Sequence, residues 1–263
     1  RIMHAALWVS KTGLTAQDKQ LTTISNNLAN ASTAGFKRDR VVFEDLLYQV
    51  QRQPGGQSSQ NTQLPTGLQL GTGVRVVSTQ KEFSTGTLQV TDQPLDMAID
   101  GRGFYEILMP DGSTAYTRNG EFSLSADGEI VNSDGFQLQP AIAIPNSTLS
   151  VTVARDGTVS ALVAGNSAPT QVGSIQLSDF LNPSGLQAVG SNLYLETASS
   201  GAAQQGTPAT NGFGSIEQGM IENSNVNIVE ELVNMITTQR TYEMNSKVIQ
   251  TADQMLQFVS QNI

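Results

Sequence analysis

The chain of 263 residues contains no cysteine and a single histidine, His4. The absence of cysteine excludes disulfides, thiolate nucleophiles and cysteine-based zinc sites. One histidine provides neither the base of a Ser-His-Asp triad in a plausible position nor a multi-histidine metal site. The sequence also has no run of about 18 apolar residues, so we expect no membrane-spanning helix. These absences predict a protein that is not an enzyme and that has no cofactor, metal or catalytic site.

The acidic charge is concentrated in the middle of the chain. The formal net charge is −9, and residues 51–225 carry six Lys/Arg against fifteen Asp/Glu, whereas both ends are near neutral. An acidic middle argues against nucleic acid or an anionic membrane as partner. The acidic positions Asp92, Asp96 and Asp100 lie in a turn- and strand-like region, so their spacing does not place them on one helical face. We interpret them as solvated surface rather than as a catalytic set.

Both ends of the chain carry apolar residues at intervals of seven. The N-terminal series is Leu7, Leu14, Leu21 and Leu28, and the C-terminal series is Ile228, Met235, Tyr242, Ile249 and Leu256. This spacing predicts long helices over about residues 3–31 and 228–263, paired as a coiled coil. Asn227 is expected to cap the second helix, with Glu230 completing a capping box.

Further apolar residues lie outside these two series. They include Trp8, Ile24, Val229, Val233 and Ile236. One partner helix cannot cover all of these faces, so the surplus indicates packing against other subunits. Whether the leucines belong to the core of one subunit or to a contact between subunits stays open at this point.

The middle of the chain has the pattern of a β domain. Six turn signals recur there: Asp100-Gly101, Asp111-Gly112, Asn119-Gly120, Asp127-Gly128, Asp134-Gly135 and Asp156-Gly157. Strand-like runs lie around them, at 104–109, 122–124, 151–154, 158–163 and 172–177. Short strands with such turns are typical of a small barrel or sandwich.

Two polar stretches, 51–73 and 198–215, have the composition of flexible linkers. The predicted fold is therefore α+β and has four parts. These are an N-terminal helix at 1–36, an extended connecting segment at 37–94, a central all-β barrel- or sandwich-like domain at 95–215, and a C-terminal helix at 216–263.

The two ends also resemble a known family. Residues 25–37, SNNLANASTAGFK, are similar to the N-terminal signature of flagellar rod and hook proteins, and 222–256 are similar to their C-terminal signature. The likeness to the distal-rod members continues through 42–49, 64–73, 96–128 and 191–197. The signature residues singled out are Asn27, Asn30, Thr33, Gly35, Phe36, Asn225, Asn227 and Glu231. The asparagines near the first helix end can serve as local helix-end chemistry, as subunit contacts, or as both.

The resemblance implies a structural subunit of the bacterial flagellar basal body. It implies a rigid hollow helical homopolymer that transmits torque from motor to hook, with the helices as inner wall and the β domain outside. The implied neighbours are proximal rod and hook proteins at the ends and basal-body ring proteins around the rod. It further implies export through the flagellar channel to a periplasm-spanning rod without a cleavable signal peptide, in keeping with the short apolar stretch before Ser10. No nucleic acid or small-molecule substrate is implied.

The segment 51–73 is the part that the resemblance assigns to the distal rod specifically. It holds Pro54, Leu64, Pro65, Leu68 and Leu70, residues that a pure linker does not need. Other functions stay in view: a carbohydrate hydrolase with paired carboxylates, a monomeric binding module with a helical stalk, and, within the family, a hook or proximal-rod subunit. The long heptad ends argue against the first two, and 51–73 favours the distal rod over the hook.

Overall fold

The fold is α+β, as the sequence predicted, with one helix at each end of the chain and strands between them. The computed structural model describes residues 2–53, 57–59, 62–63 and 66–261. The chain forms two compact units, which are described separately. Unit 1 is drawn from residues 1–29, 39–80 and 227–263, and unit 2 from residues 30–38 and 81–226.

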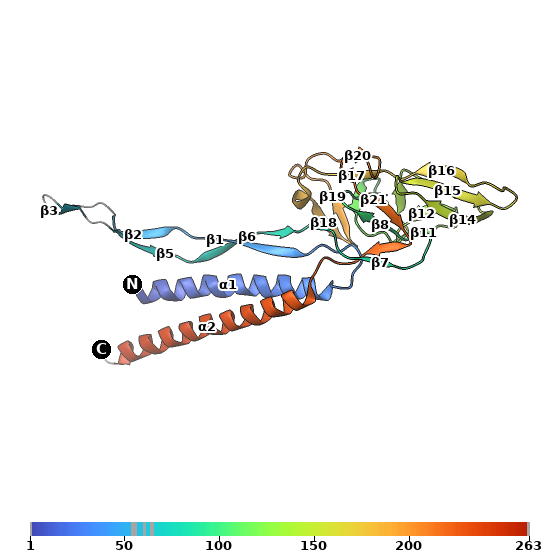
Figure 1. The fold of residues 1–263 in the computed structure, drawn as a ribbon. Helices are drawn as coiled ribbons and strands as arrows, with labels where there is room; N and C mark the ends of the chain where they lie inside the picture. Colours follow the sequence, from blue (N-terminus) through green and yellow to red (C-terminus); the bar gives the residue numbers. More distant parts are fainter. Residues whose placement is uncertain (1, 54–56, 60–61, 64–65, 262–263) are drawn as a thin grey trace. The chain divides into compact units, whose positions relative to one another are not determined.

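Unit 1 contains the two predicted helices, α1 (Ile2–Ala29) and α2 (Ile228–Gln261), which pack against each other in antiparallel directions (Figure 1). The predicted cap of α2 is confirmed. The side-chain oxygen of Asn227 accepts hydrogen bonds from the backbone N–H groups of Val229 at 3.1 Å and Glu230 at 3.3 Å. These bonds satisfy two of the backbone donors that a helix start leaves unpaired.

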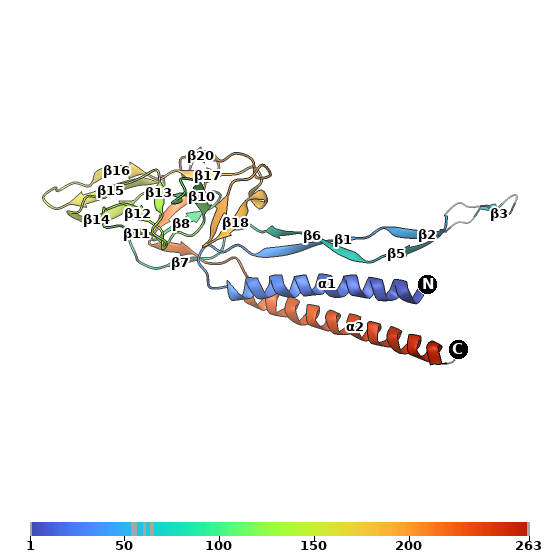
Figure 2. The ribbon, with the colours of Figure 1, turned by 180° about the vertical axis from the view of Figure 1, so that it is seen from behind.

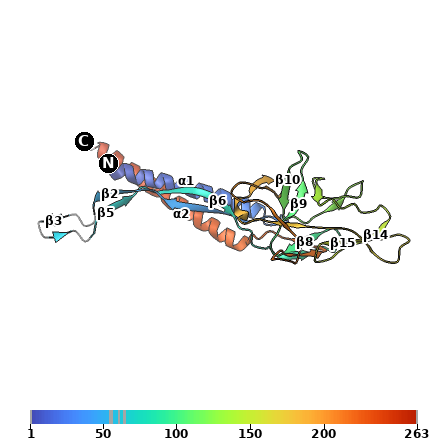
Figure 3. The same cartoon turned by 90° about the horizontal axis from the view of Figure 1, so that it is seen from above.

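A two-stranded ribbon completes unit 1. Strands β1 (Asp39–Asp45) and β6 (Val74–Lys81) pair, and β2 (Tyr48–Arg52) pairs with β5 (Leu68–Gly71). The short strands β3 (Gln57–Ser59) and β4 (Thr62–Gln63) also pair. The pair β1–β6 lies in line with the pair β2–β5 in Figures 1 and 3. The composition of 51–73 predicted a flexible linker, but the described residues of this segment form paired strands. The alternating leucines at 68 and 70 support the pairing of β5 with β2.

Unit 2 is built from open antiparallel sheets. The largest has seven strands in the order β11-β12-β13-β9-β10-β19-β18, and a second has the order β14-β15-β16 (Figure 2). The remaining strands form the pairs β17-β20, β21-β8 and β22-β7. Within the part of the chain that the structure describes, these strands do not close into a barrel. That alternative of the sequence analysis is therefore not found.

The strands of unit 2 are short, and most span two to six residues. In chain order they are β7 (Leu88–Val90), β8 (Met97–Asp100), β9 (Tyr105–Leu108), β10 (Thr114–Thr117), β11 (Ser123–Leu124), β12 (Ile130–Val131), β13 (Gln137–Gln139), β14 (Thr148–Val153), β15 (Thr158–Val163), β16 (Thr170–Ser174), β17 (Leu177–Asp179), β18 (Gln187–Gly190), β19 (Leu193–Leu195), β20 (Gln204–Gly206), β21 (Ser215–Gln218) and β22 (Met220–Glu222), with a 3-10 turn at Pro183–Gly185.

Four of the six turn signals join strands that pair with each other. They are Asp111-Gly112, Asp127-Gly128, Asp134-Gly135 and Asp156-Gly157, whose glycines have φ near +82°. Glycine reaches this conformation without the steric cost of a Cβ. The other two signals are not hairpins, since β8 pairs with β21 rather than with β9, and Asn119-Gly120 lies between β10 and β11, which do not pair.

The apolar core of unit 2 is dense. Its main cluster contains Met97, Ile99, Tyr105 and Ile107, each fully buried. A second, aromatic cluster contains Phe104, Tyr116, Phe180, Leu186 and Tyr194, with rings packed edge to face. Full burial of one such side chain stabilises a fold by about 1.5–3 kcal/mol. Unit 2 therefore has a hydrophobic core of its own.

Candidate functional site

On α2, the side that faces α1 at the seam between the two helices is made of small and polar side chains. On α1, Ile24 is also buried, at 3% exposed, although the sequence analysis counted it among the uncovered apolar residues. On α2 the buried residues Glu231, Thr238 and Ala252 recur at multiples of seven, and Asn245 belongs to the same series. On α1 the closest approach is at Gly13, where an added Cβ would lie 3.1 Å from the side-chain nitrogen of Asn245. A glycine inside a helix costs about 1 kcal/mol relative to alanine. The missing Cβ at position 13 leaves room for the end of the Asn245 side chain.

The nine residues predicted as assembly core lie beside this seam rather than within it. Leu7, Leu14, Leu21, Leu28, Met235, Ile249 and Leu256 are half-buried, and Ile228 and Tyr242 are exposed to 48% and 41%. At about 100° per residue, both series fall on the flanks of the buried positions. All nine therefore keep apolar surface that the described part of unit 1 does not cover.

Exposed apolar residues also lie on α2 outside the buried series of the seam, and we call them the outer face of α2. It consists of Val229, Val233, Ile236, Met244, Val248, Met255 and Phe258, which are 48–70% exposed. A surface helix of a globular protein normally has polar residues on its outward side. The outer face of α2 therefore indicates a contact surface.

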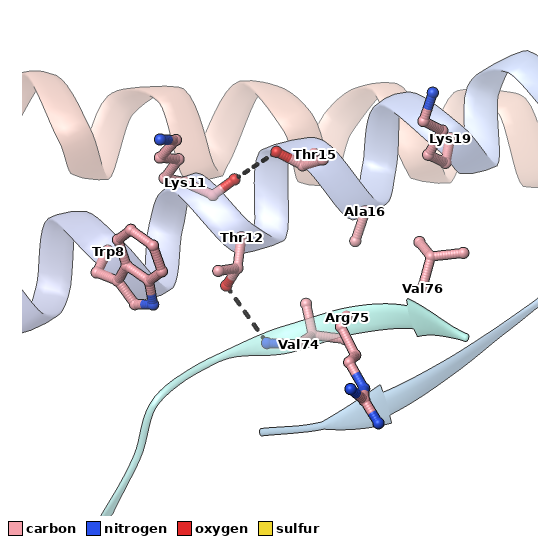
Figure 4. A pocket seen from close by; sticks show the side chains of 9 residues that line it. All are labelled: Trp8, Lys11, Thr12, Thr15, Ala16, Lys19, Val74, Arg75 and Val76. Atoms are coloured by element: carbon pink, nitrogen blue, oxygen red, sulfur yellow. Dashed lines mark hydrogen bonds between the residues drawn. The ribbon is translucent and has the colours of Figure 1, made fainter. Parts of the chain in front are cut away.

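A hollow lies between α1 and β6, also within unit 1 (Figure 4). It encloses about 310 Å³, with Ala16 and Val76 among its apolar lining and Trp8, 55% exposed, in its wall. The N–H of Val74 donates a hydrogen bond of 3.3 Å to the Thr12 hydroxyl, which fixes β6 against the helix. Lys11, whose ammonium lies 5.5 Å from the centre of the Trp8 ring, also lines the hollow.

Asn27 connects three elements of unit 1. Its side-chain nitrogen donates to the Asp39 carbonyl at 2.8 Å and to the Glu231 carboxylate at 3.4 Å. Its side-chain oxygen accepts a 2.9 Å bond from the Asp39 N–H. Asn27 and Glu231 are each 1% exposed. The structure thus brings together two signature residues that are 204 positions apart, and it joins the end of α1 to the starts of β1 and α2.

In unit 2, Asn225 has a similar role. Its side-chain oxygen accepts a 2.7 Å bond from the Arg38 N–H, and its nitrogen donates to the carbonyls of Glu82 at 2.7 Å and Ser84 at 3.2 Å. Asn225, which lies in the segment before α2, thereby connects the segment after α1 to the segment that precedes β7.

The other signature residues shape the turn that follows α1. The Thr33 hydroxyl donates to the Asn30 side chain at 3.2 Å, and the Phe36 N–H donates to the Thr33 carbonyl at 3.3 Å. Gly35 has φ +69°, and a Cβ there would lie 2.6 Å from the backbone nitrogen of Asn119. Position 35 therefore requires glycine both for its conformation and for space. Phe36 is buried, with the Lys81 ammonium 5.2 Å from its ring centre.

A charge cluster of Lys37, Arg118 and Glu222 is buried in unit 2, where the three residues are at most 3% exposed. The Lys37 ammonium lies 2.6 Å from one carboxylate oxygen of Glu222, and the Arg118 guanidinium donates to the other oxygen at 2.9 Å. The Gly86 N–H adds a 2.8 Å bond to Glu222. Arg118 further donates to the carbonyls of Gly101 at 2.8 Å and Gly103 at 2.7 Å.

The electrostatics of the cluster follow from burial and pairing. Burial alone would raise the pKa of Glu222, but Arg118 and Lys37 together hold that pKa below its ordinary value. Burial, opposed by the Glu222 charge and reinforced by Arg118, lowers the pKa of Lys37 to about 8. The cluster ties the segment after α1, the segment before α2 and the β core together, so loss of one member leaves buried charge uncompensated.

Sequence reasoning did not single out this cluster. Lys37 lies inside the N-terminal signature and Arg118 inside 96–128, yet each has the appearance of an ordinary charged residue. A charge 104 or 185 positions from its partner leaves no local pattern. The high Asx and glycine content around these positions indicated turns, but not which side chains meet.

The rod-specific residues are only partly described. Leu68 and Leu70 lie in β5 and are 49% and 39% exposed. Pro54, Leu64 and Pro65 lie outside the described residues. Among the helices described, none is long and apolar enough to cross a membrane. The described side chains include no group of acidic or histidine residues arranged to hold a metal ion.

Comparison with known proteins matches three family models along the chain. They are "Flagella basal body rod protein" at residues 7–37, "Flagellar hook protein FlgE/F/G D1 domain" at 98–161 and "Flagellar basal body rod FlgEFG protein C-terminal" at 217–262. The first match ends at Lys37, the first residue of the charge cluster. The third contains Glu222, and the second contains Arg118.

Several full-length relatives share the same name. The "Flagellar basal-body rod protein FlgG" of Buchnera aphidicola subsp. Schizaphis graminum is 53% identical, over 98% of this chain and 100% of the relative. The protein of the same name from Caulobacter vibrioides is 49% identical, over 97% and 98%. That of Bacillus subtilis is 37% identical, over 97% of each chain.

Proposed function

Because the chain belongs to the FlgG family of flagellar basal-body rod proteins, we propose that it is a structural subunit of the flagellar distal rod. It polymerises into a rigid hollow helical tube that transmits torque from the motor to the hook. The family is structural, and the chain is not an enzyme. Its first partner is itself, within the basal-body rod, with proximal rod and hook proteins at the ends and ring proteins around it.

One observation carries this proposal: unit 1 leaves apolar faces uncovered on both helices. The outer face of α2 and the nine flanking residues at Leu7 to Leu28 and Ile228 to Leu256 remain accessible in the single chain. Contiguous exposed apolar surface on a soluble protein marks interaction sites. Copies of the same chain present the same surfaces, and a head-to-tail contact between unlike patches generates an open helical polymer when its rotation does not close into a ring.

The coiled-coil pairing of α1 and α2 belongs to the proposal. The seven-residue spacing of Glu231, Thr238, Asn245 and Ala252, and the close approach at Gly13, support it. Small and amide side chains at such positions set the register of a helix pair at a cost in stability. In our proposal, residues 1–36 and 216–263 form the assembly core, 95–215 the β domain, and 37–94 the connecting segment that carries the ribbon.

The experiment that tests self-assembly is direct. Purified chain is concentrated stepwise and followed by sedimentation velocity and negative-stain electron microscopy. We expect a critical concentration above which straight hollow tubes of uniform diameter appear. A chain that stays monomeric at every concentration, with and without preformed rod seeds, contradicts the proposal.

A second candidate within the family is a hook or proximal-rod subunit. The ribbon favours the distal rod, because Leu68 and Leu70 keep exposed apolar surface that a neighbouring copy can cover in a stiff tube. Deletion of about residues 51–68 should leave polymerisation intact and give tubes of shorter persistence length in micrographs. Tubes as stiff as those of the parent chain would return the hook-like function to first place.

A further inference from the structure

We propose that the hollow between α1 and β6 is the seat for the first three turns of α2 from a second copy of the chain. The inference rests on the proposed function, since it names the contact by which one copy adds to the next. Three features of unit 1 carry it: the chemistry of the hollow, the chemistry of the α2 start, and the place of each along α1.

The hollow combines an apolar lining with a positive rim. Ala16, Val74 and Val76 line it, and Trp8 offers a half-exposed ring at one end. Lys11 and Lys19 lie on α1 with their ammonium groups directed away from β6 in Figure 4. Within the described residues neither lysine forms an ion pair.

The charge of Arg75, the third cation that lines the hollow, is neutralised within the same chain. In Figure 4 its side chain turns away from α1, and it forms an ion pair with Glu44 of β1. The charge available to a partner is therefore that of Lys11 and Lys19. An apolar occupant with an exposed carboxylate at its edge complements this site.

The first turns of α2 have that character. Val229, Val233 and Ile236 are 70%, 57% and 51% exposed and belong to the outer face of α2. Between Ile228 and Gln239 the helix carries no basic residue, and its exposed carboxylate is Glu230, since Glu231 is buried beside Asn27 in the seam.

The rest of α2 fits the hollow less well. From Arg240 onward the helix carries Arg240 and Lys247 against Glu243 and Asp253, so its charges balance. The positive rim therefore distinguishes the acidic start of the outer face of α2 from the remainder of the same apolar face.

The occupant cannot come from the same copy. Within one chain, the start of α2 is held beside Asn27 by Glu231, whereas the hollow is centred near Gly13 on α1. Fourteen helical residues correspond to about 21 Å at 1.5 Å per residue. A second copy whose α2 start fills the hollow must therefore be displaced by about 20 Å along the helix direction. Because hollow and α2 start are different surfaces, the contact is head-to-tail and repeats without closing.

Cysteine cross-linking tests the contact cleanly, because the chain has no cysteine of its own. Thr15 lines the hollow and Val233 lies on the outer face of α2. Chains that carry both T15C and V233C are polymerised and oxidised. We expect a ladder of covalent dimers, trimers and longer products, and we expect only dimers when T15C chains are mixed with V233C chains. The matched control pairs T15C with V248C, on the charge-balanced part of the same face, and should give no ladder.

Charge reversal provides an independent readout. K11E together with K19E should raise the critical concentration for polymerisation roughly ten-fold, since the attraction between the two lysines and Glu230 becomes repulsion. E230K in the same chain should restore much of the loss. The control K247E, outside the contact, should leave the critical concentration unchanged.

The outcomes separate the contact from the function it rests on. Tubes that form without the T15C–V233C ladder, or with a T15C–V248C ladder instead, overturn the contact and leave self-assembly standing. Reversal at both lysines without effect on polymerisation also overturns it, whether or not the cysteine variants assemble. Failure of the parent chain to form any polymer overturns the proposed function and this contact together.

Discussion

Unit 2 and unit 1 solve the problem of apolar burial differently. In the main core of unit 2, apolar side chains are at most 6% exposed. Unit 2 also contains the buried charge cluster of Lys37, Arg118 and Glu222. In unit 1, the outer face of α2 is 48–70% exposed, and the side of α2 that faces α1 is polar and small. The net charge follows the same division, because the acidic excess lies in the middle of the chain.

This difference indicates that the two units have different roles. Unit 2 has a densely buried apolar core of its own, in which each fully buried side chain contributes about 1.5–3 kcal/mol, so we expect it to be stable as a single copy. Unit 1 leaves more apolar surface exposed, and we propose that its stability depends on surfaces that other copies provide. In this proposal, folding and assembly are separable in unit 2 and coupled in unit 1.

We expect the largest effect on assembly from removal of both helices. A chain reduced to residues 30–226 keeps all of unit 2 together with the ribbon. We expect it to be soluble, monomeric and unable to polymerise at any concentration, with a cooperative melt of its β structure. Sedimentation velocity and circular dichroism measure both points. Tubes formed by this shortened chain would show that the helices are not the assembly elements.

The next effect concerns the charge cluster that stabilises unit 2. The substitution Glu222→Gln removes the shared anion and leaves Lys37 and Arg118 buried without it. We expect a loss of about 3–5 kcal/mol in the free energy of unfolding, measured by chemical denaturation.

The matched control is Glu217→Gln. Glu217 pairs with Arg155, whose side chain is 76% exposed, so the loss should stay below about 1 kcal/mol. Equal losses at positions 222 and 217 would mean that the buried cluster contributes no more than a surface ion pair.

Because of the Glu222 carboxylate, we expect the stability of unit 2 to fall at acid pH. In the folded chain Arg118 and Lys37 hold the pKa of Glu222 below its ordinary value of 4.5. Its contribution is therefore fully present above pH 4.5 and is lost as the pH falls through the folded value. We expect the melting temperature to drop more steeply below pH 4.5 in the parent than in Glu222→Gln. Parallel pH profiles of the two chains would contradict this assignment.

A smaller effect tests the helix seam of unit 1. Gly13→Leu places a large side chain against Asn245 and should cost about 1–3 kcal/mol through overpacking, seen as a higher critical concentration. Gly13→Ala is the control. Its Cβ meets only the end of the Asn245 side chain, and alanine favours the helix by roughly 1 kcal/mol, so assembly should be unchanged or better. Equal assembly of all three chains would show that the helices do not approach closely at this position.

Sequence patterns predicted the parts of the fold that are set locally. The two helices, the Asn227 cap and four glycine turns follow from spacing and from single residues. The patterns did not predict the ribbon, because the composition of 51–73 resembles a linker and strand pairing depends on a distant partner. The heptad leucines were predicted as assembly core, either within one subunit or between subunits, and they stay half-buried in the single chain. The buried seam on α2 instead contains Glu231, Thr238 and Ala252, which carry no hydrophobic signal in the sequence.

Some residues of the candidate site could likewise be predicted from the sequence, and others could not. Asn27 and Glu231 were identified by resemblance, and the structure adds that they contact each other. Lys37, Arg118 and Glu222 could not be paired from sequence, because a buried ion pair has the same residue types as a solvated one. The outer face of α2 was anticipated through Val229, Val233 and Ile236, whose surplus already indicated contacts beyond one partner helix.

Hydrogen exchange, compared between monomer and polymer, tests the central claim most directly. In verified monomer we expect slow exchange in β8 and β9 of unit 2 and fast exchange along α1 and α2 of unit 1. In the polymer the helices should become as slow as the strands, while unit 2 changes little. Helices that are equally protected in monomer and polymer would contradict the claim that unit 1 is completed by other copies.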